Sequence, residues 1–486
     1  MQASHAALFR ECTHQTYELE RSGHSAKAFQ LLRPSEQNVE QALDWQLAQG
    51  DTEAYLQWCA QACMLQLTHG RIRRAIARLR QGVQLPVRSD AELSHSAKCC
   101  FTLSRALLSV NDLAGSVQAV RQARQRARGS DDELLIEKIG TQLCVVRVVQ
   151  MSLRAATMHI EEVIRRRQSA YAPWGSPSLL SVYGGVLLQR GEFRKALPAA
   201  ESALDAALSR NNRTDILLAH QQLLSVSLRH GLLDRARVHA NECKAIENFG
   251  SNGVSHLYRQ FLYFFLHLES EEYELARACL STVRGLVTAT QLPWDREITL
   301  GAELVAAEAG CGVPLPTTPS MQGLNQGDFV YLYAQVHCLR VRVLAQQGDT
   351  IESQASLKAA LTLIRRSRNQ LWASWLATSV AGMAADRAEH DVARRFLVQA
   401  EQLQRSAGIV PSPRQLTSWR RVRELAGFAL ELETLTPPSD QPLLATVDAL
   451  EGWARSELAA PAATRARSAK RGPKRTAGKT HFTLEA

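Results

Sequence analysis

The sequence predicts an all-α fold, a right-handed superhelical solenoid built from antiparallel helix pairs. Three observations support this prediction. Apolar residues recur at helical spacing along most of the 486 residues. A small residue returns at an equivalent place about every 40 residues. The alternating apolar runs bounded by hairpin turns that would indicate strands are missing.

The small residue defines the repeat register. Glycine precedes it by five residues in several units, as Gly191 precedes Ala196, Gly231 precedes Ala236 and Gly23 precedes Ala28, whereas Glu271 takes the place of the turn glycine in one unit. The steps are 40 residues, apart from one of 41 and one double step of 77. The register residues are Ala75, Ser116, Ala156, Ala196, Ala236, Ala276, Ser353 and Ala393.

The register has a physical reason. Two antiparallel helices need a small residue where they approach closely, and the turn between them favours glycine, which adopts positive φ without steric cost. One pair cannot bury its apolar face alone, so pairs must stack. This arrangement is tetratricopeptide-like, with a period longer than the usual ~34 residues. We expect nine to ten pairs, a number extrapolated from the register.

The register predicts two regions. Residues 1–455 form the helical repeat array, and residues 456–486 form a basic, disordered tail. The array is interrupted at residues 310–328, where Pro314, Pro316 and Pro319 exclude a regular helix. This segment is either a degenerate repeat or a long surface loop.

The tail carries much of the positive charge. The chain has 57 Lys and Arg against 47 Asp and Glu, a formal net charge of +10. Residues 464–486 hold seven cations and one acid, Glu485. Such a tail is either simply solvated or binds nucleic acid or an acidic partner with strong salt dependence. Its cations are Arg465, Arg467, Lys470, Arg471, Lys474, Arg475 and Lys479.

Composition places the protein among folded, cytoplasmic chains. Hydrophobic residues make up 45% of the sequence, which excludes wholesale disorder. Residues 1–15 lack the features of a signal peptide. The longest uncharged run, residues 369–385, is too short and too polar to span a bilayer, so we expect a buried helix and no membrane association. The ten cysteines lie mostly in apolar helical segments, which favours reduced, buried thiols.

Two segments carry a resemblance to a known family. Residues 35–85 resemble the start of the helical-repeat region of bacterial STAND-class signalling ATPases, many of which have winged-helix or LuxR-type DNA-binding domains. Residues 392–427 resemble their last repeat and its capping helices. The matching features in the first segment are Glu36, Asn38, Ala42–Trp45, Gly50–Asp51 and Gly70–Arg71. The resemblance implies a role in bacterial signalling or transcriptional regulation.

The ATPase of that family has no counterpart in this sequence. A P-loop needs GxxxxGK[ST] between a strand and a helix. The nearest approach, Gly472–Thr480, has five intervening residues and only six residues after it. We therefore predict no nucleotide site, no cofactor and no ATPase activity.

Other signs of catalysis or metal binding are weak. Cys59 and Cys63 share one helix face, but His69 is the only further ligand nearby, so buried apolar packing is the expected role of both thiols. No HExxH or CxxC-plus-HxxxH pattern occurs, and no Ser/His/Asp arrangement is visible by motif. We predict that the protein is not an enzyme and holds no metal.

The register also predicts a ligand-binding face. Five aromatic residues cluster within Tyr258–His267. They either line a concave groove for a peptide or effector, or pack between neighbouring helices where small residues are missing. The predicted partner groove consists of Lys98, Phe101, Arg105, Ser181, Gln221, Ser225, Tyr258, Phe261 and Phe265.

The sequence therefore predicts a non-catalytic scaffold that binds a protein, peptide or effector in its groove. Two alternatives remain open. The chain is a nucleic-acid-associated protein that binds through residues 464–486, or it is a remnant of a larger STAND regulator.

Overall fold

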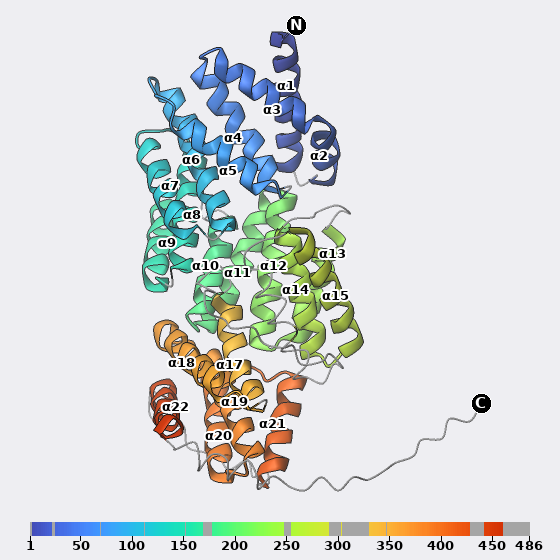
Figure 1. Ribbon diagram of the computed structural model, residues 1–486, viewed down its shortest axis with the longest axis vertical. Coiled ribbons are helices and arrows are strands. Elements are labelled where there is room, and N and C mark those ends of the chain that lie inside the picture. The colour runs from blue at the N-terminus through green and yellow to red at the C-terminus, as the bar shows by residue number, and fades with distance from the viewer. Residues whose placement is uncertain are drawn as a thin grey trace, which may run out of the picture.

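The chain folds into α-helices joined by turns. A computed structural model describes residues 2–21, 25–68, 70–110, 112–150, 152–168, 177–246, 254–290, 303, 330–346, 348–427 and 442–459. Within these ranges there is no strand, and Arg33–Ser35 is a short 3-10 helix. The helices stack side by side into an elongated array (Figure 1). The predicted all-α fold of antiparallel helix pairs is thus confirmed. The predictions for residues 310–328 and for the tail cations concern residues outside these ranges.

Three helices precede the regular pairs: α1 (Gln2–Arg21), α2 (Ser25–Leu32) and α3 (Glu36–Ala48). The pairs are α4 (Thr52–Thr68) with α5 (Ile72–Val83), α6 (Asp90–Ser109) with α7 (Leu113–Arg126), α8 (Glu133–Val149) with α9 (Leu153–Gln168), α10 (Pro177–Gln189) with α11 (Phe193–Ser209), α12 (Arg213–His230) with α13 (Leu233–Ile246), α14 (Val254–Glu269) with α15 (Tyr273–Thr290), α17 (Val330–Gln346) with α18 (Thr350–Ser367), and α19 (Gln370–Asp386) with α20 (His390–Ala407). The helices α21 (Pro413–Ala426) and α22 (Pro442–Ala459) follow, and α22 extends four residues past the predicted end of the array at residue 455.

The register residues occupy one structural position. Each is the fourth residue of the second helix of its pair, and each is buried. The two serines at this position also make a hydrogen bond to the first helix. The hydroxyl of Ser116 donates to the carbonyl of Ser104 at 2.9 Å, and that of Ser353 donates to the carbonyl of Val341 at 2.7 Å. A small side chain is therefore needed because the two backbones approach closely here.

Enlarging a register residue should destabilise the array. Ala236 on α13 is fully buried, whereas Ala245 on the same helix is exposed. We expect Ala236→Leu to lower the free energy of unfolding by about 1–3 kcal/mol, because the added carbons have no space. Ala245→Leu is the matched control and should leave it within about 0.5 kcal/mol. Urea unfolding followed by circular dichroism measures both, and equal effects would contradict the assigned register.

The turns within pairs use the left-handed backbone conformation. Gly191, Gly231 and Gly348 have φ of 73°, 72° and 82°. Glu271 and Ala388 adopt the same conformation without being glycine, with φ of 61° and 60°. The prediction that Glu271 stands in for the turn glycine is therefore confirmed.

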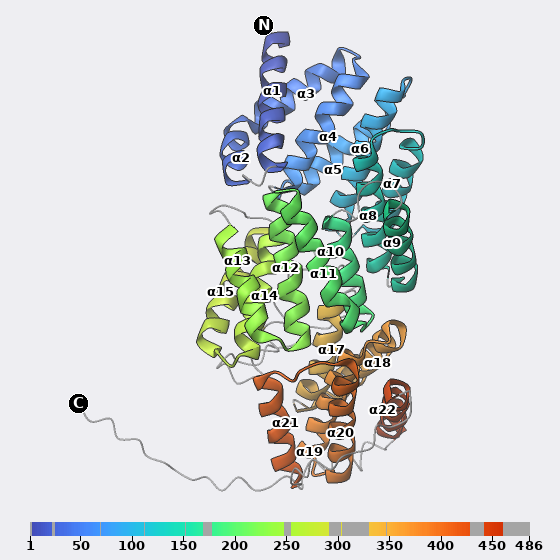
Figure 2. The same cartoon turned by 180° about the vertical axis from the view of Figure 1, so that it is seen from behind.

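The last helices dock against the middle of the array. We call α17–α22 the C-terminal block, and it lies against the ends of α10, α12 and α14 (Figure 2). Asn369 donates its side-chain amide to the carbonyls of Leu188 and Gln189 at 3.0 and 2.9 Å. These carbonyls belong to the last turn of α10, where helix carbonyls lack partners within the helix.

Two further contacts repeat this pattern at neighbouring first helices. The backbone N–H of Val410 donates to the carbonyl of His230 at the end of α12, at 3.0 Å. The guanidinium of Arg414 donates to the carboxylate of Glu269 at the end of α14, at 2.8 Å. The simple open array expected from the register is therefore incomplete, because the C-terminal block closes over the ends of three first helices.

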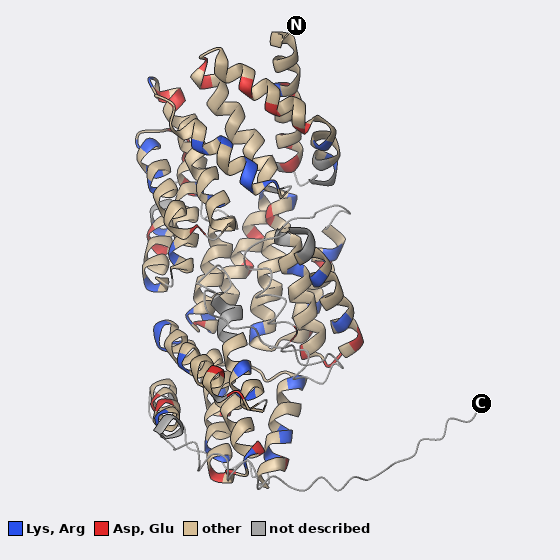
Figure 3. Ribbon diagram, viewed as in Figure 1, with Lys and Arg blue, Asp and Glu red and all other residues tan. Residues whose placement is uncertain are grey.

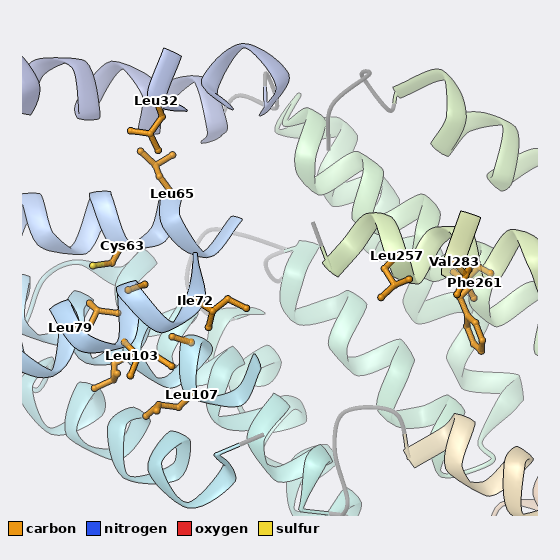
Figure 4. Packing of buried hydrophobic residues seen from close by; sticks show 14 of the residues in the cluster. Leu32, Cys63, Leu65, Ile72, Leu79, Leu103, Leu107, Leu257, Phe261 and Val283 are labelled. Atoms are coloured by element: carbon orange, nitrogen blue, oxygen red, sulfur yellow. The ribbon is translucent and has the colours of Figure 1, made fainter. Parts of the chain in front are cut away.

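Apolar packing runs between the helices along the array. One cluster joins side chains of the N-terminal repeats with side chains of α14 and α15, including Leu79, Leu103, Leu257 and Phe261 (Figure 4). The uncharged run at residues 369–385 forms α19, most of whose residues are buried, as predicted. Among the described helices, none combines the length and apolar character needed to cross a bilayer.

Candidate functional site

The most spacious hollow described lies among α1, α4, α6 and the start of α8. Its volume is about 260 Å³. We call it the N-terminal pocket. Its lining combines amides, charged groups and two aromatic rings. The lining residues are Tyr17, Glu18, Gln57, Ala60, Gln61, Met64, His95, Lys98, Phe101, Thr102, Asp132, Leu134, Leu135 and Lys138.

Helical spacing brings these side chains to one face of each first helix. On α4, Gln57 and Gln61 are four residues apart, so the two amides lie one above the other. On α6, Lys98 and Phe101 are three apart and share a face in the same way. The opposite faces of these helices are apolar and buried, which fixes the polar face toward the pocket.

Asp132 connects the wall of the pocket to the fold. One carboxylate oxygen accepts the backbone N–H of Leu135 at 2.9 Å and so caps α8. The other lies 3.1 Å from the ammonium of Lys98. Burial alone would raise the pKa of Asp132, but these two hydrogen bonds lower it below its usual value. Asp132 is therefore a fixed anion that holds Lys98 at the edge of the pocket.

His95 and Arg105 complete the α6 side of the pocket region. Burial, and then the Lys98 ammonium, lower the pKa of His95, which is thus neutral at pH 7. Its Nδ1 atom is buried and has no hydrogen-bond partner among the described residues. Arg105 is exposed and lies against Met64, with its guanidinium 3.1 Å from the sulfur and 5.9 Å from the centre of the Phe101 ring.

The predicted groove residues fall into separate groups. Lys98 and Phe101 line the N-terminal pocket and Arg105 is next to it. Gln221 and Ser225 on α12 instead face α14, where Ser225 and Tyr258 have their hydroxyls 3.4 Å apart. Gln221 accepts a hydrogen bond from Arg259 at 3.3 Å. Ser181 on α10 has a buried hydroxyl without a partner among the described residues.

The aromatic cluster on α14 packs between helices. Phe261 and Phe265 are only 2% and 3% exposed, and their rings meet edge to face at 4.7 Å. Tyr263 and Phe264 are buried in the same apolar cluster. This placement agrees with the packing alternative of the sequence analysis, while ligand binding at this face stays a prediction.

Several pocket residues could have been found from the register. Stepping back 41 residues from Lys98 gives Gln57, and stepping forward 40 gives Lys138, so all three occupy one repeat position. Tyr17 and Glu18 on α1 carry no such signal, because α1 precedes the regular pairs.

The cysteines are placed as structural thiols. Nine cysteines lie in described residues; all are free and seven are buried. Cys59 and Cys63 have their sulfurs 3.9 Å apart, and Cys99 donates to the carbonyl of Leu56 at 3.4 Å. Among the residues that the structure places, no three His, Cys, Asp or Glu side chains are arranged to hold a metal ion.

Comparisons with known proteins give only distant likenesses. No family model and no curated sequence matches the chain. A Rap protein complexed with competence and sporulation factor is 11% identical, with a TM-score of 0.45 over 84% of this chain and 99% of that one. The apo form of RapI is 13% identical, with a TM-score of 0.38 over 74% and 98%. A circular tandem repeat protein with novel repeat topology is 13% identical, with a TM-score of 0.14 over 97% and 98%. At these values the likenesses assign neither a family nor a function, and the architecture rests on the helices described above.

Proposed function

We propose that this protein is a non-catalytic binding scaffold whose N-terminal pocket holds a short peptide segment. The observation that carries the proposal is the stacked amide pair, Gln57 and Gln61, on the pocket face of α4. Each amide has both donors and an acceptor, so the pair matches the N–H and C=O groups of an extended peptide backbone. The resemblance of residues 35–85 and 392–427 to STAND regulators supports a role in bacterial signalling or transcriptional control.

The size and charge of the pocket narrow the ligand. About 260 Å³ is below the ~300–1,000 Å³ usual for drug-sized molecules, so it accommodates one or two side chains of a longer segment. Phe101 and Tyr17 offer ring surface for an apolar side chain. Lys98 and Lys138 oppose Asp132 and Glu18, so the charges are balanced and do not select a highly charged ligand.

Peptide selection tests the proposal. A library of random twelve-residue peptides displayed on phage is selected on the full chain, and selected peptides are titrated by fluorescence anisotropy. We expect Gln57→Ala/Gln61→Ala to weaken their binding about tenfold, since each lost neutral hydrogen bond costs about 0.5–1.5 kcal/mol.

A matched pair of glutamines serves as the control. Gln81 on α5 and Gln125 on α7 are exposed on second helices, away from the pocket. Gln81→Ala/Gln125→Ala should leave peptide affinity unchanged. Failure to enrich any peptide, or equal loss in both double variants, would reject the pocket as a peptide site.

A further inference from the structure

The outer surfaces of α5 and α7 differ in composition from those of the other second helices. Neither helix contains an acidic residue, and together they carry seven arginines. Apart from arginine, their exposed side chains are only glutamine and alanine. Figure 3 shows both helices in blue and tan, without red. This surface is the one we examine for a partner.

Part of the arginine set is engaged in the fold. On α5, Arg78 pairs with Glu40 and Asp44 of α3, and Arg74 lies 4.0 Å from Glu36. On α7, Arg126 donates to the carbonyl of Val83 at 2.9 Å, which joins the C-terminal ends of α7 and α5. The two helices therefore lie side by side, and their remaining arginines project from a common surface.

The remaining arginines have no acidic partner. Arg73, Arg121, Arg124 and Arg128 are exposed, and within the described ranges no carboxylate lies within 4.0 Å of them. Arg80 is also exposed, at 3.8 Å from Asp112. Arg121, Arg124 and Arg128 are three and four residues apart, so they follow one helix face over about 10 Å. We call these five residues the basic outer face.

The other second helices have a different surface. Exposed apolar side chains stand on α9, α11, α13, α15 and α18, as Met158, Leu208, Val238, Leu275 and Ile351. A protein interface needs such apolar or aromatic residues at its centre. The basic outer face has none, whereas arginine and glutamine are the side chains that contact phosphate oxygens in nucleic-acid complexes.

We propose that the basic outer face binds the phosphate backbone of nucleic acid without reading its sequence. Arginine suits this task because its planar guanidinium makes paired hydrogen bonds to phosphate and keeps its charge. The site is separate from the N-terminal pocket, which lies on the first helices, and from the basic tail. It therefore adds a binding activity that does not depend on the peptide proposal.

The experiment measures binding of a 24-base-pair DNA duplex at 50 and 150 mM NaCl by fluorescence anisotropy. All chains are full length, with the seven tail cations replaced by glutamine so that the tail contributes nothing. We expect Arg73→Gln/Arg121→Gln/Arg124→Gln/Arg128→Gln to weaken binding at least tenfold at 50 mM salt. The slope of log K against log[salt] should fall by about 3 to 4, since each phosphate contact contributes about 0.9.

A matched variant controls for net charge. Lys358→Gln/Arg366→Gln/Arg420→Gln/Arg421→Gln removes four exposed cations from α18 and α21. It should weaken binding less than threefold. The corresponding arginine-to-lysine variant of the basic outer face should retain most of the affinity. Thermal unfolding checks that all variants fold, which we expect because the four arginines make no ion pairs in the described structure.

Three outcomes would overturn the proposal. One is failure of the tail-neutralised parent to bind the duplex at 50 mM salt. Another is equal weakening in the two quadruple glutamine variants, which would show a general charge effect. The third is polyglutamate binding as tightly as DNA and being lost in the same variant, because the surface would then suit an acidic protein.

Discussion

Replacing Gly231 with alanine should lower the free energy of unfolding by at least about 3 kcal/mol. Gly231 has a φ of 72°, and a Cβ added there would lie 1.8 Å from the carbonyl oxygen of Val410. That oxygen belongs to the backbone, so no rotamer change relieves the overlap. The C-terminal block must move away from α12, which breaks the hydrogen bond from Val410 to His230. Large losses of this kind arise from overpacking combined with strained backbone.

Gly348 provides the control for the backbone conformation alone. Its φ is 82°, and an added Cβ would meet nothing within 4 Å. Gly348→Ala should therefore cost only about 1–2 kcal/mol, the usual penalty for a left-handed non-glycine residue. Urea unfolding of both variants separates the two costs. If Gly231→Ala is no worse than Gly348→Ala, the docking of the C-terminal block at α12 is wrong.

Replacing Arg78 with methionine should cost about 3–5 kcal/mol. The Arg78 guanidinium is 11% exposed and lies 2.5 Å from both Glu40 and Asp44. Glu40 is itself 18% exposed. Removing one member of a largely buried ion pair leaves the other charge without compensation, and this accounts for the size of the loss. The contact joins α3 to α5, so the variant also weakens the start of the array.

Two comparisons test the ion-pair explanation. Arg74→Met removes an exposed arginine 4.0 Å from Glu36 and should cost less than about 1 kcal/mol. Glu40→Gln/Arg78→Met should lose less stability than the two single variants added together, because no buried charge is stranded. Additive losses, measured by urea unfolding, would show that packing rather than charge dominates at Arg78.

The repeat register could be predicted because it depends on local geometry. A close helix approach demands a small residue wherever it occurs, so Ala196 and Ala236 mark the same structural place 40 residues apart. The same holds for the turn, where Glu271 takes the conformation of a glycine. Short-range constraints of this kind leave a periodic trace in the sequence.

The docking of the C-terminal block could not be predicted in this way. Asn369 contacts Leu188 across 181 residues of sequence, and Arg414 contacts Glu269 across 145. Asn369 also caps α19, and capping alone explains an asparagine at that place. Its second role depends on two helix ends meeting in space, which no periodic pattern records.

The candidate site was predicted in part. Lys98 and Phe101 lie in the N-terminal pocket because the register places them on the exposed face of a first helix. The register alone does not distinguish an open face from one covered by a neighbour. Phe261 occupies the same repeat position as Phe101, yet it is buried in packing on α14. Tyr17 reaches the pocket from α1, which has no repeat signal.

The docking of the C-terminal block also limits how this protein can change length in evolution. Arrays of this type usually lengthen or shorten by duplicating or losing whole helix pairs. Here the ends of α10, α12 and α14 each hold a fixed partner in one later block. Duplicating a pair among these helices would carry Glu269 a full repeat away from Arg414. Over this stretch the number of repeats is therefore fixed by the protein's own tertiary contacts.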